Sequence, residues 1–309
     1  MQLLDDGEKY RVHFGDCIEH LATMPDASVD FSIFSPPFPS LFSYTSEAAD
    51  IGNSEDLSAE AKIHLSFFFN QLRRVVKPGR VVCVHVMQIP ALARNGEKDT
   101  WDFRGTVIRI AKRAGFTWDI DWTIGKNPQA QAIRTHSHRL LFVTLSRDRA
   151  VSCPAFVDYI IKFRAPGENA VPICSESEIS RQDWINWAEG HWHWNEVYET
   201  DTLNTAPAKG EDDVKHICPL QLEVIRRCIL LYTNPGEIVF SPFAGIGSEG
   251  FSSLGGISPK TKRSILYPRR FYGCELKQEY YDECVRNLDK AIKQHRNKSA
   301  LPLFDLDGV

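Results

Sequence analysis

The 309-residue sequence predicts an α/β fold, a mostly parallel twisted sheet with helices on both faces. Short apolar runs alternate along the chain with longer stretches of helical periodicity, which is the pattern of parallel βαβ units. Hydrophobic residues make up 43% of the chain and charged residues 25%. A chain of this length and composition can bury one large domain, with or without an insertion.

The first half of the chain contains four predicted strands and three predicted helices. Apolar runs predict strands over residues 10–14, 29–34, 80–86 and 117–124. Helical periodicity predicts helices over 17–24, 58–76 and 100–114. Turn residues separate these elements, namely Gly15-Asp16, Lys77-Pro78-Gly79 and Gly115.

The second half repeats this alternation around a segment of different composition. Strands are expected over 139–145, 237–240 and 270–274, and amphipathic helices over 219–232 and 278–294. Residues 166–213 carry eleven acidic residues against Arg181 and Lys209, together with four tryptophans. This segment therefore looks like a separately composed insert.

Bulk composition excludes several classes of protein. No apolar run reaches the roughly 18 residues that indicate a membrane span, and the N-terminus lacks a basic and then apolar signal sequence. None of the eight cysteines pairs at the two-residue gap of zinc or thioredoxin-like sites. We expect a cytoplasmic protein with reduced thiols and no metal.

Basic residues gather between positions 125 and 165, although the formal net charge of the whole chain is −4. Seven basic residues face two acidic ones in this window. It could be a surface that contacts phosphate or an ordinary solvated face. The candidates for DNA contact are Lys126, Arg134, His136, His138 and Arg139. A second basic segment, residues 255–272, could contact DNA phosphate or form a surface loop.

Three polar features follow predicted strands where a nucleotide-like ligand could bind. Gly245 and Gly247 lie between a strand and a helix, an arrangement that lets a ligand approach the backbone, although a glycine turn can also be a tight connection. Glu275 ends the next strand, where a carboxylate can accept hydrogen bonds from ribose hydroxyls or simply face solvent. Asp16 could face an adenine amino group or cap the helix that starts at Cys17.

A resemblance connects these features. The strand-end Ser-Pro-Pro-Phe, the later Ser-Pro-Phe-x-Gly-x-Gly-Ser and the following Gly-Cys-Glu-Leu resemble motifs IV, I and II of S-adenosylmethionine-dependent DNA amino-methyltransferases. Their order resembles the permuted β class of N4-cytosine and N6-adenine enzymes. Other stretches resemble the family in the same order, including "LRRVVKPGRVVCVHV", "WTIGKNP" and "HICPLQLEVIRRCILLYTNPGEIVFSPFAG".

The resemblance implies a Rossmann-like class I methyltransferase fold with S-adenosylmethionine as cofactor. It implies a catalytic half at 1–145, a target-recognition insert at 146–214 and a cofactor-binding half at 215–309. The residues that it assigns to the cofactor are Asp16, His216, Ser241, Pro242, Phe243, Gly245, Gly247, Ser248 and Glu275. Double-stranded DNA is the implied substrate, a cognate restriction endonuclease is an expected partner, and the protein is expected to be a monomer or homodimer.

The catalytic stretch Ser35, Pro36, Pro37 and Phe38 suits amino methylation for physical reasons. The Ser35 hydroxyl and the Pro36 carbonyl can accept the two amino hydrogens, which directs the nitrogen lone pair to the methyl donor. Prolines fix φ and add carbonyls without competing N–H groups. Phe38 is expected to stack on a flipped base, with a core position as the alternative.

The substrate base is predicted to be cytosine, because serine at the first position of this motif usually accompanies N4-cytosine enzymes in the family. N6-adenine methylation is the alternative, since a hydroxyl can accept from either amino group. Carbon-5 methylation is rejected because the chain has no Pro-Cys pair for a nucleophile. Ser241 stands where the family usually has Asp, which leaves a catalytically silent DNA-binding relative as a further alternative. A nicotinamide-dependent Rossmann enzyme fits poorly, because its glycine loop would lie near the first strand.

Overall fold

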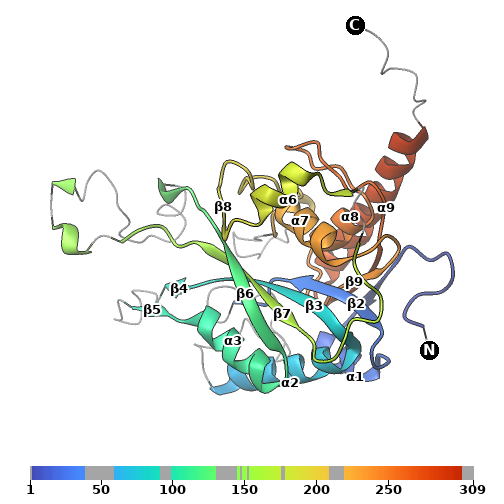
Figure 1. Cartoon of the computed structure of the whole chain (residues 1–309), viewed down its shortest axis with the longest axis horizontal. Helices are drawn as coiled ribbons and strands as arrows, with labels where there is room; N and C mark the ends of the chain where they lie inside the picture. The colour runs from blue at the N-terminus through green and yellow to red at the C-terminus, as the bar shows by residue number, and fades with distance from the viewer. Residues whose placement is uncertain are drawn as a thin grey trace, which may run out of the picture.

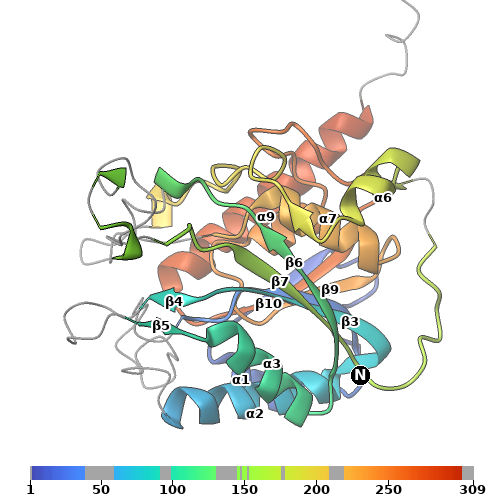
Figure 2. The same ribbon diagram turned by 60° about the vertical axis from the view of Figure 1, so that its left-hand side comes forward.

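The computed structural model describes residues 2–38, 59–90, 99–129, 145–146, 148–151, 153–174, 178–208 and 219–300. An eight-stranded sheet lies between two layers of helices (Figures 1 and 2). One face is covered by α1 (Cys17–Thr23), α2 (Ala59–Val75) and α3 (Phe103–Arg113), and the other by α7 (Leu222–Tyr232), α8 (Ser248–Ser253) and α9 (Gln278–Ala300). The predicted α/β fold is confirmed.

The sheet has the order β1-β10-β9-β2-β3-β7-β6-β8. Five neighbouring strands are parallel: β1 (Tyr10–Phe14), β10 (Arg270–Glu275), β9 (Ile238–Ser241), β2 (Val29–Phe34) and β3 (Val76–Met87). Strand β7 (Asp158–Arg164) runs antiparallel to both β3 and β6 (Thr117–Ile124), and β8 (His191–Trp192) pairs with β6 at the edge. The chain leaves β9 toward β10 and leaves β2 toward β3, so the strand order reverses between β9 and β2. Open α/β sheets bind ligands at such a switch point.

Most predicted elements are present, with some shifted boundaries. The strands over 10–14, 29–34 and 117–124 have the predicted bounds. Strand β3 begins at Val76, directly after α2, because Val76 pairs with Val29 and a register shift absorbs the predicted break. Helix α3 begins after its cap Asp102, and Thr100–Trp101 instead form β5, which pairs with β4 (Ile89–Pro90). The strand predicted over 139–145 lies almost wholly outside the described residues.

Strand β7 was not predicted. It lies within the range 146–214 that the resemblance assigns to target recognition, yet it is paired on both sides within the main sheet. Its sequence, Asp-Tyr-Ile-Ile-Lys-Phe-Arg, lacks a regular alternation of apolar and polar residues, so it gives only a weak strand signal. The boundaries of the recognition insert stay a prediction, but this strand belongs structurally to the sheet.

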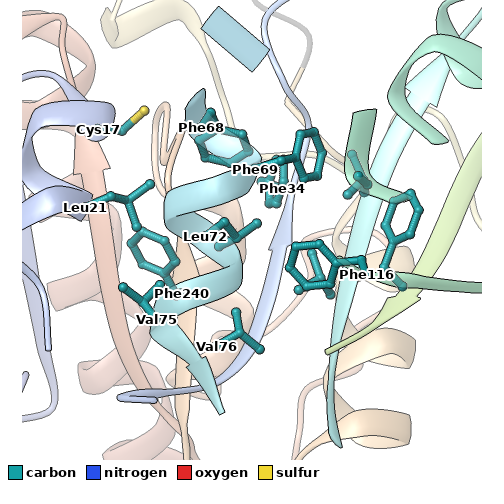
Figure 3. Close-up of a cluster of buried hydrophobic side chains, with 14 of the residues drawn as sticks. Cys17, Leu21, Phe34, Phe68, Phe69, Leu72, Val75, Val76, Phe116 and Phe240 are labelled. Atoms are coloured by element: carbon teal, nitrogen blue, oxygen red, sulfur yellow. The ribbon is translucent and has the colours of Figure 1, made fainter. Parts of the chain in front are cut away.

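Both faces of the sheet are buried against apolar side chains. Every residue of β2 is buried, which is what a parallel strand covered on both sides requires. On the α2 side, the Phe34 ring meets the Phe68 ring edge-on with centroids 5.3 Å apart, and neither side chain is exposed (Figure 3). Full burial of one such side chain contributes roughly 1.5–3 kcal/mol. On the opposite face, Ile225 of α7 and Leu288 of α9 lie in a second cluster.

The tryptophans of the acidic insert divide into two buried and two exposed side chains. Trp187, at the end of α6 (Arg181–Trp187), and Trp192 are buried, and Trp192 stacks on Trp122 of β6 with centroids 5.4 Å apart. The Arg227 guanidinium lies 5.5 Å from the Trp187 ring centre and 5.1 Å from that of Trp192. These contacts attach the insert to the sheet and to α7, whereas Trp184 and Trp194 are exposed.

The basic segment 255–272 is tied to the rest of the protein rather than open to a ligand. Arg269 is buried and forms a two-point ion pair with Glu178, at 2.7 and 2.8 Å. Lys260 lies 4.5 Å from the Tyr198 ring centre, and Arg263 contacts Glu223 at 3.3 Å. Lys262 donates to the Pro259 carbonyl at 2.7 Å and Arg270 to the Gly236 carbonyl at 3.0 Å, so all five basic residues of the segment have internal partners. In the described part of the chain, no helix is long and apolar enough to cross a membrane, and no cluster of potential metal ligands occurs.

Candidate active site at the switch point

Strand register brings the two predicted halves of the site together. Ser32 of β2 lies opposite Phe240 of β9, so both strands end at the same edge of the sheet. The glycine loop that follows β9 and the Ser-Pro-Pro turn that follows β2 are therefore neighbours. On the other side of β2, Phe34 pairs with Val84, which places Ser35 beside His85 of β3.

The glycine loop has the backbone conformations that its sequence predicts. Gly245 and Gly247 have φ values of 52° and 86°, in the left-handed region that favours glycine. A Cβ on Gly247 would lie 2.8 Å from Cys284 Sγ, so this glycine permits close packing against α9. A Cβ on Gly245 would have no atom within 4 Å, so that side of the loop is open.

Two carboxylates lie at the ends of the strands next to this loop. Glu275 accepts hydrogen bonds from the Gly245 N–H at 2.7 Å and the Lys277 N–H at 2.9 Å, so it fixes the shape of the loop. Asp16 caps α1 by accepting from the Ile18 N–H at 2.6 Å, as one of its two interpretations predicted. It follows β1, which pairs with β10 so that Phe14 lies opposite Glu275.

The serines of the motif have unused polar atoms. Ser241 and Ser248 are buried, and neither hydroxyl has a hydrogen-bond partner among the described residues. Phe243 is partly buried, with its ring centre 5.1 Å from that of Phe68, and Pro242 is buried. Unpaired hydroxyls, an open glycine loop and two strand-end carboxylates together suit S-adenosylmethionine, whose ribose and amino groups need acceptors. His216, the remaining predicted cofactor residue, lies outside the described residues.

Glu249, which follows Ser248 in α8, gives a pH-dependent prediction. Burial, with a smaller contribution from the nearby Glu275 charge, raises the pKa of Glu249 to about 8. The unfolded chain releases this proton near pH 4.5, whereas the folded protein keeps it, so stability decreases as the pH rises from about 4.5 to about 8. Between about pH 5 and pH 8, the free energy of unfolding of the wild type should fall by an amount on the order of a few kcal/mol, as measured by urea unfolding. In Glu249→Gln this fall should be absent, because glutamine has no proton to keep. Glu279→Gln, an exposed change on α9, should keep the wild-type slope; equal slopes for Glu249→Gln and wild type would contradict the assignment.

The turn predicted to be catalytic, Ser35–Phe38, is held against β3. The Ser35 hydroxyl donates to the His85 main-chain carbonyl at 3.3 Å, and its oxygen lies 3.2 Å from His85 Nδ1. Ser35 and Pro37 are partly buried and Pro36 is buried. Because Pro36 and Pro37 have no N–H, only acceptor groups follow the serine along the main chain.

Phe38 does not have the environment that base stacking requires. Its side chain is 8% exposed and packs in the core with its ring centre 5.5 Å from that of Phe103. Stacking on a flipped base would need this ring to leave the core. The predicted stacking role is therefore not supported, and the core position that was its alternative is observed.

Lys126 also has a different role from the predicted contact with DNA phosphate. Its side chain is 13% exposed, and its ammonium lies 2.5 Å from the buried carboxylate of Asp158. An ammonium that is mostly buried and paired inside the protein is a poor phosphate contact. The other predicted DNA-binding residues, Arg134, His136, His138 and Arg139, lie outside the described residues.

His85 and Asp158 were missed by the sequence analysis. His85 is a polar residue inside the Val-rich run of β3, near its carboxyl end, and that position is a usable signal. Asp158 opens β7, and without that strand its sequence position indicates nothing. Their meeting with Ser35 depends on strand order.

Comparisons with known proteins agree with this geometry. A family profile described as DNA methylase, of the N6/N4 type, matches residues 29–286. The Type II methyltransferase M.Cfr9I of Citrobacter freundii is 24% identical over 308 residues, covering 89% of this chain and 86% of the relative.

Solved structures share the fold. A Thermus thermophilus protein described as a putative DNA modification methylase, in complex with S-adenosyl-L-methionine, has a TM-score of 0.64 at 20% identity and covers 92% of this chain and 96% of its own. The PvuII DNA methyltransferase, cytosine-N4-specific, has a TM-score of 0.63 at 16% identity, with 94% and 95% covered. With the profile match over most of the sequence, the chain belongs to the DNA methylase family of amino-methyltransferases, and its methyl donor is S-adenosylmethionine.

Proposed function

We propose that the protein methylates the exocyclic N4 of cytosine within a specific short DNA sequence. The observation that carries this proposal is the Ser35 hydroxyl, which lies at the switch point beside the open glycine loop. The site needs no nucleophile, only acceptors that orient an amino group. N6-adenine methylation by the same site is the second candidate, because a hydroxyl accepts from either amino group.

The residues of the catalytic turn would act by orientation. S-adenosylmethionine supplies an electrophilic methyl group when bound. Ser35 Oγ and the Pro36 carbonyl accept the two amino hydrogens, which draws the nitrogen lone pair out of the ring plane. The two prolines hold these acceptors before the base arrives, so little ordering is needed at the moment of reaction. A flipped base is required, because the amino nitrogen is inaccessible inside a duplex.

The described thiols support direct transfer without a covalent enzyme–base intermediate. Burial raises the pKa of Cys17, Cys83 and Cys284 well above that of an ordinary thiol, so these are poor nucleophiles. The exposed Cys153 and Cys174 do not follow a proline in the sequence. The described thiols thus support amino methylation over carbon-5 methylation.

The substrate and partners extend the proposal. Double-stranded DNA is the substrate that the family implies, and we place target recognition within residues 146–214, outside β7. M.Cfr9I is a Type II methyltransferase, which supports the expectation of a cognate restriction endonuclease for this chain. The PvuII enzyme is cytosine-N4-specific, which supports the choice of base.

Nucleoside mass spectrometry tests the proposal. Purified protein is incubated with labelled S-adenosylmethionine and unmethylated DNA of varied sequence, and the digested product is analysed. We expect N4-methylcytosine. N6-methyladenine would establish the second candidate. Cofactor binding without any transfer would identify a catalytically silent relative and overturn the proposal.

A further inference from the structure

Ser35, His85, Asp158 and Lys126 form a continuous chain of polar contacts beneath the catalytic turn. Ser35 Oγ lies 3.2 Å from His85 Nδ1, and His85 Nε2 lies 2.9 Å from Asp158 Oδ2. The same carboxylate oxygen contacts Lys126 Nζ at 2.5 Å. The four residues come from the end of β2, from β3, from the start of β7 and from the turn after β6.

The antiparallel direction of β7 makes this chain possible. A parallel strand would bring its last residues to the ligand edge of the sheet, whereas β7 brings its first. Asp158 pairs with Met87 of β3 and Ile124 of β6, both at the carboxyl ends of their strands. A buried carboxylate is thereby placed behind His85, where solvent is excluded.

The charges near Asp158 determine where the hydrogens lie in this series of contacts. Burial by itself would raise the pKa of Asp158, but the Lys126 ammonium and His85 lower it to about 2, so this carboxylate is charged at neutral pH. A charged carboxylate only accepts hydrogen bonds, so His85 Nε2 carries the hydrogen in their contact. The neutral imidazole then presents a lone pair on Nδ1, 3.2 Å from Ser35 Oγ, and the hydroxyl hydrogen turns to it from the His85 carbonyl, its other acceptor at 3.3 Å. The serine oxygen keeps its own lone pairs for an amino group.

We infer that His85, oriented by Asp158 and Lys126, accepts through the Ser35 hydroxyl the proton that methyl transfer releases. The inference rests on the proposed function and adds the destination of the proton.

The step balances in atoms and charge. The amino nitrogen forms a bond to the methyl carbon as the carbon–sulfur bond breaks. The nitrogen then gives one proton to Ser35 Oγ, and the hydroxyl proton of Ser35 passes to His85 Nδ1. The positive charge lost by the sulfonium is then on the imidazolium, whose Nε2 contacts the Asp158 carboxylate at 2.9 Å.

The charged groups around His85 favour this acceptance. Asp158 contacts the ring directly, Lys126 neutralises part of that charge, and Glu199 lies 4.0 Å from the Lys126 ammonium. The Asp158 carboxylate is the charge in direct contact with the ring, so an imidazolium that forms there has an opposite charge 2.9 Å away.

The same distances would suit a Ser-His-Asp nucleophile, but the main chain argues against acyl transfer. Such sites need N–H donors for an oxyanion, commonly including the backbone near the nucleophile. Pro36 and Pro37, the two residues after Ser35, have no N–H. The arrangement therefore serves to remove a proton rather than to attack a carbonyl.

Two substitutions at His85 separate proton acceptance from orientation. In His85→Gln the side-chain amide reaches the position of Nε2 and keeps a donor toward Asp158. In His85→Asn the amide oxygen lies near the position of Nδ1 and keeps an acceptor toward Ser35. Neither amide takes up a proton, so both variants should lose about 10²-fold in single-turnover methyl transfer while binding S-adenosylmethionine as wild type does.

The pH profile distinguishes this from a structural role. The wild-type rate should fall as the pH decreases, because a protonated His85 cannot accept the released proton, and both variants should lose this acidic decline. His20→Gln is the matched control, because His20 stacks on His13 and contacts the Tyr272 hydroxyl on the β1–β10 side of the sheet. It should keep the wild-type rate and profile. A wild-type rate in His85→Gln would overturn proton acceptance by His85. Activity in His85→Asn alone would also overturn it, because an acceptor toward Ser35 would then be sufficient.

A measurement without turnover tests the hydrogen-bond arrangement around His85 independently. In ¹⁵N spectra of the cofactor-free protein at about pH 8, we expect the His85 tautomer with hydrogen on Nε2, and a loss of that preference in Asp158→Asn. The opposite tautomer in wild type would overturn the inference, as would labelling of Ser35 by a fluorophosphonate probe. If wild-type protein transfers no methyl group, the proposed function fails, and the tautomer still reports on the contacts themselves.

Discussion

Ser35→Ala is expected to lower single-turnover methyl transfer to DNA by about 10²- to 10⁴-fold while leaving S-adenosylmethionine affinity unchanged. The change removes the hydroxyl that we propose accepts an amino hydrogen, and it breaks the contact with His85 Nδ1. Among the described residues, the hydroxyl's contacts are with His85 and not with the glycine loop, so the cofactor half should be unaffected. Rapid-quench transfer of labelled methyl groups and equilibrium titration of the cofactor give the two measurements.

Ser28→Ala is a suitable control for this variant. Ser28 precedes β2 at the opposite edge of the sheet, where its hydroxyl donates to the Pro25 carbonyl at 2.7 Å. It loses one hydrogen bond of similar kind, so its rate should remain within about twofold of wild type. A Ser35→Ala variant that was equally active would remove Ser35 from the mechanism.

Glu178→Ala is expected to reduce the free energy of unfolding by about 3–5 kcal/mol. It leaves the buried Arg269 guanidinium without its counter-charge, since both of its terminal nitrogens donate to this carboxylate. The remaining donors go to the Tyr267 carbonyl and to the hydroxyl and carbonyl of Thr233, which cannot neutralise the charge. Urea unfolding followed by circular dichroism measures the loss.

The control for this variant is Glu189→Ala. Glu189 is an exposed acid of the same insert, and removing it should change stability by less than about 0.5 kcal/mol. A double variant, Glu178→Leu with Arg269→Met, should recover much of the loss, because two apolar side chains need no counter-charge. Equal stabilities of Glu178→Ala and Glu189→Ala would contradict the assigned role of the ion pair.

The fold could be predicted because its strongest signals are local. Strands such as Val29–Phe34 are apolar along most of their length, and turn residues separate them from amphipathic helices. The glycine loop could be predicted for the same reason, since Gly245 and Gly247 lie between a strand and a helix. Proline restricts φ and glycine permits positive φ, so both residues indicate local backbone conformation in a single sequence.

The remaining parts of the site depend on contacts between distant segments. Phe38 is next to two prolines in a turn, yet tertiary packing against Phe103 decides its position. Lys126 looks like a surface cation until β7 brings Asp158 beside it. The positions of Lys126 and Asp158 depend on the order of the strands in the sheet. Because β7 was not predicted, the contact of Asp158 with His85 could not be predicted either.

The central pairing of the sheet determines when this protein can become active during synthesis. Ser32 of β2 donates to the Phe240 carbonyl of β9, a hydrogen bond that spans 208 residues. Contacts of such long sequence separation are slow to form, because the chain must close a large loop first. On the ribosome, the first half can build β2 and β3 but has no β9 to complete the switch point. The nascent chain therefore cannot complete the switch point until β9 and the glycine loop after it have emerged, which places assembly of the candidate site after folding of the first half.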